Sequence, residues 1–177
     1  MALNQWELTL LDRLADAFHC GFLDAVMPAL TFLGDGGWFW ILLACLLLLR
    51  KPTRRMGLTV GLALLLSLLV GNIILKPLVA RIRPFDLNEA IQLLIPPPGD
   101  FSFPSGHTQA SFAAATAIYC YHKRAGRWCL ALAALIGFSR LYLYAHYPSD
   151  VLAGLVIGVA LGAAAYRLSQ LIFLKSL

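Results

Sequence analysis

Charged residues are scarce in this chain of 177 residues. Asp, Glu, Lys and Arg make up 13% of it and apolar residues 60%, whereas soluble domains carry about 25% charged and 45–50% apolar residues. A soluble domain of this size could not hide so much apolar surface from water, but a bilayer can take the place of an internal core. The composition therefore excludes an ordinary soluble protein and indicates one integral membrane domain over residues 1–177.

Paired cysteines and metal-binding clusters are also missing. The four cysteines have no paired spacing, and we expect them to be small buried apolar side chains rather than disulfides; they are Cys20, Cys45, Cys120 and Cys129. No Cys and His cluster has the spacing of a metal site, so we expect neither a metal nor a cofactor. The N-terminus lacks a basic leader followed by an apolar stretch and a small-residue cleavage site, so a cleaved signal peptide is not expected.

A basic stripe with interleaved aromatic residues, typical of nucleic-acid binding, is absent too. The formal charge of +5 comes from short basic clusters between apolar runs. That distribution is what membrane topology produces. We therefore expect a bilayer around the protein and no nucleic-acid partner.

Five apolar segments can be recognised, and they cover residues 37–49, 56–75, 105–121, 128–144 and 148–168. The first is short for a bilayer core of about 30 Å, and it could be lengthened by residues 30–33 across Asp35 and two glycines. Barrel strands would alternate polar and apolar residues, which these segments do not. The sequence predicts an all-α, polytopic transmembrane helical bundle of five spans, with a sixth left open, whose helical core covers residues 37–174.

Residues 1–36 form a separate N-terminal segment without a clear span. Its apolar side chains recur at helical spacing with polar residues between them; they are Trp6, Leu8, Leu10, Leu11, Leu14, Ala15 and Phe18. This pattern is typical of an amphipathic helix in the outer membrane interface. A helix packed against the bundle is an equal alternative.

The basic clusters orient the chain in the membrane. Residues 50–55 contain four basic residues and residues 123–127 contain three, with Arg167 and Lys175 on the same side. The positive-inside rule places these loops in the cytoplasm. Residues 1–36 carry five acidic residues and one basic residue, Arg13, in agreement with a position on the opposite, extracytoplasmic side.

The loop over residues 84–103 is long for a compact bundle. Asp86 and Glu89 have capping-box spacing ahead of the apolar residues 90–95, and three prolines follow at positions 96–98. We expect a short interfacial helix and a rigid return, with a plain connector as the alternative.

Polar residues stand at the ends of the predicted spans, where charge is costly and needs a reason. They are Lys76 and Arg83 after the second segment, Ser105, Gly106 and His107 at the start of the third, Arg140 near the end of the fourth, and His146 and Asp150 at the turn into the fifth. Because successive spans alternate in direction, all of these positions meet on the extracytoplasmic face. Singly, Lys76 and Arg83 could be interface anchors, Ser105 a helix cap and His146 a structural histidine. Their convergence indicates a site.

This combination of residue types fits phosphoryl transfer to histidine. Three cations, Lys76, Arg83 and Arg140, can surround a phosphate, and the helix start at Ser105 and Gly106 offers backbone N–H groups to an anion. A neutral His146 can attack phosphorus while Asp150, one helical turn later, holds its other ring nitrogen. His107 can then protonate the leaving oxygen and later accept a proton from water.

The pattern resembles a known family. Lys76-x6-Arg83-Pro84, then Pro104-Ser105-Gly106-His107, then Ser139-Arg140-x5-His146-x3-Asp150 is similar to the three motifs of the type 2 phosphatidic acid phosphatase superfamily. The resemblance covers residues 76–150 and implies a helical membrane core and a metal-free phosphohistidine mechanism. It implies His146 as nucleophile, Asp150 as its partner and His107 as acid, with Lys76, Arg83, Ser105, Gly106 and Arg140 around the phosphate. Many bacterial members have six spans, so the five counted here leave the N-terminal topology open.

The function expected from residues and resemblance together is hydrolysis of a membrane lipid phosphate at the extracytoplasmic face of the cell membrane. Undecaprenyl diphosphate is the first candidate because its phosphate faces outward and Arg83-Pro84-Phe85 resembles that subgroup. Phosphatidylglycerol phosphate or phosphatidic acid is the alternative, and a lipid phosphotransferase is the alternative from another class. The oligomeric state is left open.

For other residues near the motifs we expect structural roles at the membrane surface. Arg81 is off the pattern, and we expect it to anchor the surface. The aromatic residues that flank the motifs are expected to form an interfacial belt; they are Phe101, Phe103, Tyr142, Tyr144 and Tyr147.

Overall fold

The computed structural model describes residues 2–88 and 91–174, and within these two ranges it contains helices and no strands. The longer helices are α1 (Ala2–Phe18), α2 (Gly21–Phe32), α3 (Trp38–Leu49), α4 (Arg54–Ser67), α7 (Gly106–Tyr121), α8 (Lys123–Tyr142) and α9 (Pro148–Leu174). A π-helix, η3 (Leu68–Leu75), continues α4 into the short α5 (Lys76–Val79), and one further turn forms α6 (Pro84–Leu87). Short 3-10 turns, η1 (Asp35–Gly37) and η2 (Lys51–Thr53), precede α3 and α4.

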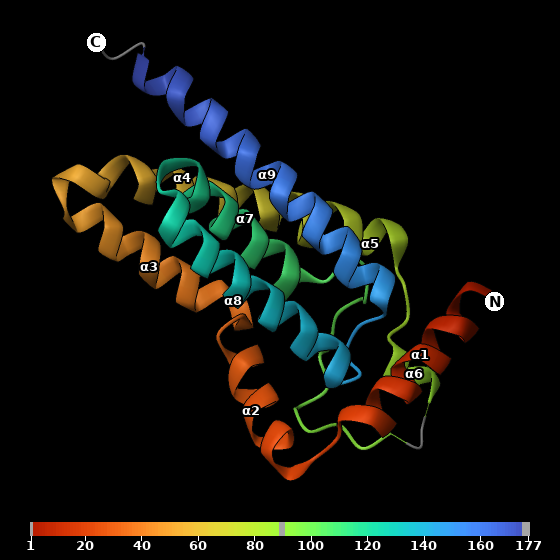
Figure 1. Ribbon diagram of the computed structural model, residues 1–177. Coiled ribbons are helices and arrows are strands. Elements are labelled where there is room, and N and C mark those ends of the chain that lie inside the picture. Colours follow the sequence, from red (N-terminus) through yellow and green to blue (C-terminus); the bar gives the residue numbers. More distant parts are fainter. Residues whose placement is uncertain (1, 89–90, 175–177) are drawn as a thin grey trace.

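Helix α7 is the centre of the bundle and packs against α4, α8 and α9 (Figure 1). Its buried residues cover most of its circumference, and alanines fill much of its middle, from Ala113 to Ala117. Small side chains let the neighbouring helices approach closely, which is how helices associate when lipid removes the hydrophobic drive between them. The functional groups at the start of α7 are therefore held by a rigid central element.

Three glycines of α9 form the closest of these contacts. A Cβ atom at Gly154, Gly158 or Gly162 would lie 2.8, 2.5 or 2.4 Å from a backbone oxygen of residues 105, 109 or 113 on the α7 side. The four-residue spacing puts all three glycines on one face of α9. Glycine at these positions fixes the distance between the two helices.

We expect Gly158→Ala to destabilise the protein by about 2 kcal/mol, because the added methyl group meets the backbone oxygen of Gln109 and the helices must separate. Gly61→Ala in α4 is the matched control, since no atom lies within 4 Å of its added Cβ; alanine should stabilise that helix by up to about 1 kcal/mol. Thermal unfolding in detergent measures both. Equal melting temperatures for the two variants would contradict the close α7–α9 contact.

All five predicted apolar segments fall on helices. Two stretches of the described chain, Lys51–Leu87 and Pro148–Ile172, are long and apolar enough to cross a membrane singly. Gly21–Phe32 and Asp35–Leu49 together form a third candidate, bent by 45°. Helix α7 has 16 residues, fewer than the roughly 20 that a bilayer core requires. The count of five spans therefore stays a prediction.

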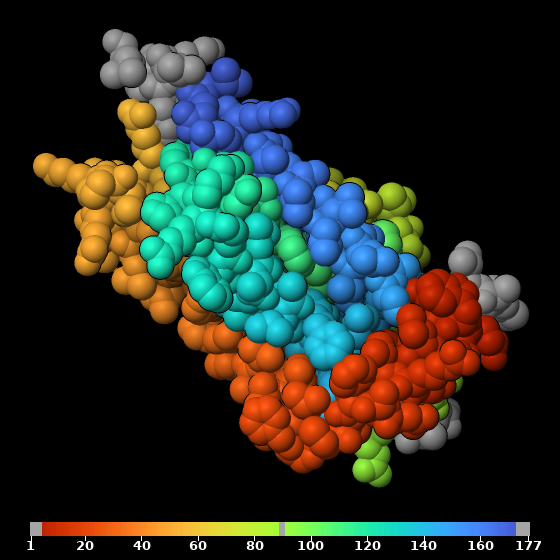
Figure 2. All heavy atoms as spheres, in the orientation of Figure 1, coloured from red at the N-terminus to blue at the C-terminus, as the bar shows by residue number. Residues whose placement is uncertain are grey.

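The N-terminal segment is two helices rather than one. Helix α1 lies across the end of the bundle at which α9 begins (Figure 1), and the red and orange atoms of α1 and α2 cover this end (Figure 2). Leu11 is 1% exposed and packs with Tyr144 and Tyr147. Of the two alternatives for this helix, packing against the bundle is the one that these contacts support; its place in the membrane interface stays a prediction.

The helix expected within residues 86–95 is wrong in position. The structure has one helical turn earlier, α6, while residues 91–95 are not helical, and Glu89 and Ala90 lie outside the described residues. Pro84 at the first turn favours a helix start there, since proline suits that position. Residues 91–105 then lead back to the bundle without a helix or strand.

The two ends of the bundle differ in charge. The basic turns at η2 and between α7 and α8 lie at the end of the bundle away from α1 (Figure 1). The predicted site residues lie at the α1 end. Lys175, which the topology prediction also used, is outside the described residues.

Candidate active site

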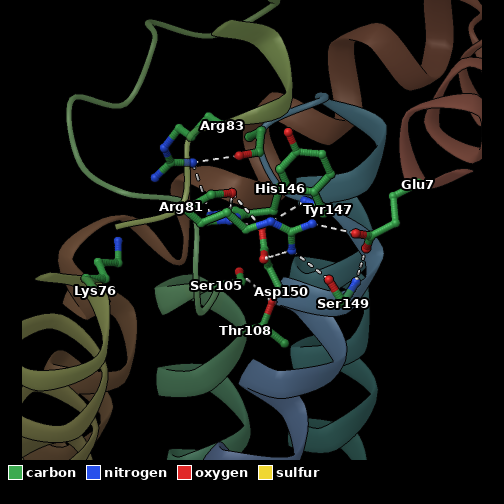
Figure 3. A network of polar contacts seen from close by, with 12 residues as sticks. Glu7, Lys76, Arg81, Arg83, Ser105, Thr108, His146, Tyr147, Ser149 and Asp150 are labelled. Carbon is green, nitrogen blue, oxygen red and sulfur yellow. Dashed lines mark hydrogen bonds and ion pairs between the residues drawn. The ribbon is translucent and has the colours of Figure 1, made fainter. Parts of the chain in front are cut away.

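Separate elements contribute the predicted site residues at one end of the bundle, and Figure 3 shows five of them together: Lys76, Arg83, Ser105, His146 and Asp150. Lys76 starts α5, Arg83 precedes α6, His107 lies in the first turn of α7, and Arg140 lies in the last turn of α8. His146 stands in the turn between α8 and α9, and Asp150 follows in the first turn of α9. The backbone N–H of Ser105 donates to the carbonyl of Asp150 at 3.1 Å, which joins the start of α7 to the start of α9.

The three predicted phosphate-binding cations are all buried: Lys76 is 6% exposed, Arg83 3% and Arg140 1%. Lys76 and Arg83 both bind the carboxylate of Asp100, which belongs to the loop before α7. Arg83 also donates from Nε to the Asp100 carbonyl at 2.7 Å and from Nη1 to the Ala145 carbonyl at 2.6 Å. Although partial burial raises the pKa of Asp100, hydrogen bonds and charge from Lys76 and Arg83 outweigh it and lower that pKa to about 2.

Arg140 has no such carboxylate. Its Nη1 donates to Thr31 Oγ1 at 2.6 Å, and its Nε has no hydrogen-bond partner among the described residues. No Asp or Glu of those residues forms an ion pair with it. A buried guanidinium without a counterion is costly, so this position is suited to an anion supplied from outside the chain.

His146 is 1% exposed and lies beside these cations. Its Nε2 is 3.3 Å from Arg83 Nη1, and its Nδ1 is 3.5 Å from Ser102 Oγ and 3.6 Å from Asp150 Oδ2. The predicted pairing with Asp150 is thus within ion-pair range but longer than a hydrogen bond. Burial, followed by the positive charge of Arg140, Arg83 and Lys76, lowers the pKa of His146 well below its usual 6.5. The imidazole is therefore neutral near pH 7 and can act as a nucleophile.

This shift predicts the acid side of the pH–activity profile. A nucleophilic imidazole loses activity when it is protonated, so a lowered pKa preserves activity as the pH falls through 6.5, and the loss follows only at lower pH. Profiles of kcat/KM measured in detergent, corrected for ionisation of the substrate, test this. Arg140→Gln removes the foremost cationic contribution and should move the acid limb to higher pH; a wild-type limb above pH 6.5 would contradict the buried neutral histidine.

Asp150 is fully buried and fixed by three donors. Its Oδ2 accepts hydrogen bonds from Ser102 Oγ at 2.5 Å and from the backbone N–H of Tyr147 at 3.0 Å, and its Oδ1 accepts one from Arg81 Nη1 at 2.6 Å. Ser102 lies outside the motifs, and no pattern in the sequence marks it as a site residue. The contacts hold the carboxylate in one orientation beside His146.

Arg81 is not the surface anchor that its position predicts. It ion-pairs with Asp150 and with Glu7 of α1, donates to Ser149 Oγ at 2.7 Å, and lies 3.8 Å over the Tyr147 ring (Figure 3). Glu7 is 2% exposed and also accepts a hydrogen bond from the backbone N–H of Ser149 at 2.8 Å. The guanidinium is drawn inward because two buried carboxylates need a partner.

We expect the Glu7–Arg81 pair to be strongly coupled. Arg81→Met leaves Glu7 and Asp150 buried without their cation and should destabilise the protein by about 3 kcal/mol. Glu7→Gln added to Arg81→Met should recover part of this loss, so that the double-mutant cycle shows a coupling energy of about 1–3 kcal/mol. Unfolding in detergent measures it, and additive effects would show that α1 is not bound through this pair.

The prediction of an interfacial aromatic belt is wrong for three of its residues. Tyr142, Tyr144 and Tyr147 are each less than 5% exposed. The hydroxyl of Tyr142 donates to Asp24 at 2.6 Å and that of Tyr144 donates to Asp12 at 2.8 Å. Two acidic residues of the N-terminal segment therefore bind the end of α8 and the turn that follows it.

The three predicted site residues at the start of α7, Ser105, Gly106 and His107, have different surroundings. Ser105 is fully buried, and its hydroxyl lies 2.9 Å from Thr108 Oγ1, so it is bound inside the protein. A Cβ atom on Gly106 would lie 3.3 Å from Asn72 Oδ1 and 4.0 Å from Lys76 Nζ, which shows how closely this backbone approaches the cation. His107 Nε2 lies 2.7 Å from Asp35 Oδ1, a contact that nothing in the motif predicts.

An apolar cavity of about 700 Å³ leads from the charged groups into the bundle. Lys76, Asp100 and His107 line one part of it, and side chains of α3 and α4 such as Ile41, Leu48 and Leu62 line the rest. Its composition suits a hydrocarbon chain attached to a charged head group. No group of three or more His, Cys, Asp or Glu side chains placed to hold a metal ion occurs in the part of the chain that the structure describes.

Comparison with known proteins identifies relatives. The chain is 35% identical over 134 residues to the undecaprenyl-diphosphatase of Sulfolobus acidocaldarius, covering 73% of this chain and 64% of the relative, which is less than two thirds of its length. It is 32% identical over 155 residues to the undecaprenyl-diphosphatase BcrC of Bacillus subtilis, covering 87% and 79%. It is also 32% identical over 157 residues to the lipid A 4'-phosphatase of Bacteroides thetaiotaomicron, covering 81% and 68%.

Two solved structures have the same fold. The PAP2-type phosphatidylglycerolphosphate phosphatase of Bacillus subtilis superposes with a TM-score of 0.79 at 23% identity, over 97% of this chain and 88% of that one. Aquifex aeolicus LpxE superposes with a TM-score of 0.72 at 31% identity, over 90% and 94%. The family model of the PAP2 superfamily matches residues 56–173. This chain, a multi-pass membrane protein with those helices and motifs, therefore belongs to the PAP2 superfamily and is a phosphatase of that family.

Proposed function

We propose that the protein hydrolyses a phosphate ester or diphosphate of a membrane lipid through a phosphohistidine formed on His146. The observation that carries the proposal is the placement of a buried imidazole, kept neutral by its surroundings, among three buried cations. One of these cations, Arg140, has no counterion among the described residues. Fixed positive charge of this kind favours the transition state of phosphoryl transfer, in which negative charge is spread over the phosphate oxygens.

The distances around His146 support a proposed assignment of the steps to named atoms. Nδ1 of His146 faces Ser102 and Asp150, so Nε2, beside Arg83, is the nitrogen that attacks phosphorus. The bond from Nε2 to phosphorus forms as the bond to the leaving oxygen breaks, and His107 donates a proton to that oxygen. Water then attacks the phosphohistidine, His107 accepts a proton from it, and the Nε2–phosphorus bond breaks to release phosphate.

A phosphate that enters this site meets Asp100 first. The Asp100 carboxylate shares Lys76 and Arg83, the two cations that a phosphate would contact. Half of the Asp100 side chain is exposed, whereas both cations are buried. Because the loop that carries Asp100 lies outside the helices, the carboxylate can give way while the cations stay in place.

The substrate is proposed to be a prenyl diphosphate, with undecaprenyl diphosphate as the first candidate. The apolar cavity joined to the charged groups fits a long hydrocarbon chain, and two of the relatives described above are named undecaprenyl-diphosphatases. Phosphatidylglycerol phosphate and phosphatidic acid are the alternatives. The basic turns at the opposite end of the bundle support a cytoplasmic position for that end, and therefore an extracytoplasmic site in the cell membrane.

A phosphate-release panel with purified protein in detergent tests the proposal. Undecaprenyl diphosphate, phosphatidylglycerol phosphate and phosphatidic acid are compared at equal mole fraction in the micelle, and the prenyl diphosphate should have the highest kcat/KM. A second series adds an acceptor lipid. If phosphate appears on that lipid and not in solution, the protein is a phosphotransferase; if no lipid phosphate is consumed, the proposed function is wrong.

A further inference from the structure

One contact of the proposed acid comes from outside the motifs. Asp35 lies in η1, the turn between α2 and α3, and its Oδ1 is 2.7 Å from His107 Nε2. The family model begins at residue 56, so this turn lies outside the part of the chain that it matches. Within the described residues, Asp35 is the carboxylate at ion-pair distance from His107.

The turn that carries Asp35 has a sequence suited to this contact. A Cβ atom on Gly34 would lie 2.6 Å from Cδ2 of the His107 ring, so only glycine lets the backbone come this close. Gly36 and Gly37 have φ angles of 57° and 71°, a region that side chains disfavour. Three glycines around one acidic residue cost conformational entropy on folding. The conformation that these glycines allow places the backbone of the turn in contact with the imidazole of His107.

The contact leaves one ring nitrogen for chemistry. A carboxylate only accepts hydrogen bonds, so Nε2 carries a hydrogen that it donates to Asp35. Nδ1 is then the nitrogen that can exchange a proton with substrate or water. The Nε2–H group stays hydrogen-bonded to Asp35 in both steps, so the ring keeps one orientation. Nδ1 can therefore give a proton to the leaving oxygen in the first step and take one from water in the second.

We propose that Asp35 is the positioning residue of the general acid, and that it orients His107 so that Nδ1 delivers the proton to the leaving group. The proposal rests on the proposed function, in which His107 has that role. How much the reaction depends on this proton is set by the leaving group of the substrate. An alkyl or glyceryl oxygen is a poor leaving group and needs the proton, whereas a nitrophenyl oxygen leaves readily as an anion and does not.

The test compares two phosphate monoesters that differ in the leaving group, a short-chain phosphatidic acid and 4-nitrophenyl phosphate. For Asp35→Asn, kcat/KM should fall about 10- to 100-fold with the first ester and less than about threefold with the second. The ratio kcat/KM covers only the steps up to departure of the leaving group, so slow hydrolysis of the phosphohistidine does not mask the difference. His107→Ala should show the same selectivity with a larger loss.

Asp24→Asn is the matched control, because Asp24 belongs to the same N-terminal segment and binds a tyrosine hydroxyl instead of His107. It should change kcat/KM for the two esters by the same factor. Equal losses with both esters for Asp35→Asn would make Asp35 a structural anchor, and a gain in activity would make it an inhibitory contact; either result overturns the proposal. If the wild-type protein cleaves neither ester nor any lipid phosphate, the proposed function itself fails, and the role of Asp35 with it.

Discussion

Replacing His146 with alanine is expected to lower kcat by a factor of about 10⁴ or more. The nitrogen proposed to attack phosphorus is lost, and alanine offers no other nucleophile at this buried position. The cations would still bind the substrate, so KM should change much less than kcat. Phosphate release from the best substrate of the lipid panel, measured with purified protein, checks this.

The control for this loss is His122→Ala, which removes a histidine at the opposite end of the bundle, where its Nδ1 caps α8. We expect its kcat to stay within about twofold of the wild type and its melting temperature to fall slightly, as for loss of a helix cap. A folded His146→Ala protein that retained more than a few per cent of wild-type turnover would rule out His146 as the nucleophile.

Arg140→Gln should reduce kcat/KM by about 10²- to 10³-fold, the usual cost of losing a fixed charge that binds the transition state. Glutamine keeps most of the side-chain volume and can still donate to Thr31, but it carries no charge. Among the described residues, Arg140 donates to Thr31 through Nη1 while its Nε has no partner, so its removal costs one hydrogen bond to another side chain. The variant should therefore fold as well as the wild type while losing activity.

Two controls separate charge from packing at this position. Arg140→Ala leaves space for a guanidinium ion, and added guanidinium at millimolar concentration should restore part of its activity. Thr31→Val removes the hydroxyl that accepts the hydrogen bond from Arg140 Nη1 and should cost no more than about tenfold in kcat/KM. If Arg140→Gln kept full activity but melted earlier, Arg140 would be a structural residue and not a phosphate ligand.

The helices and the convergence of the motifs could be predicted from local patterns. Long apolar runs bounded by charge define helices in lipid, and alternating directions decide which helix ends share a face. Lys76, His107, Arg140 and Asp150 stand at such ends, so their arrangement follows from topology alone. Close packing of α7 on α9 has a local signature as well, in the spacing of Gly154, Gly158 and Gly162, although spacing does not say which helix the glycines face.

The partners of the motif residues could not be predicted. Glu7 binds Arg81 across 74 positions and Asp35 binds His107 across 72, and neither acid has a neighbour in sequence that marks it as functional. The sequence favours a surface anchor at Arg81, because an arginine near a span end usually is one. Asp150 and Glu7 draw it inward, and the position of Glu7 depends on how α1 folds back. Ser102 and Asp100 approach the site only because the loop after α6 returns to it.

The N-terminal segment therefore supports the site from outside the motifs. Glu7 acts on Asp150 through Arg81, Thr31 binds Arg140, and Asp35 binds His107. The three residues contacted in this way are the partner of the proposed nucleophile, a proposed phosphate-binding cation and the proposed acid. We expect substitutions in α1 and η1 to change catalysis although they lie far from the motifs in sequence.

Direct capture of the phosphorylated protein is the decisive measurement. Protein turning over a lipid diphosphate labelled in its terminal phosphate is quenched in alkali, which preserves phosphohistidine, and the labelled peptide is identified by mass spectrometry. The label should lie on His146 in the wild-type protein and accumulate when His107 is replaced by alanine, because hydrolysis of the intermediate then lacks its base. Label on another residue, or an unlabelled protein under conditions of steady turnover, would contradict the phosphohistidine mechanism.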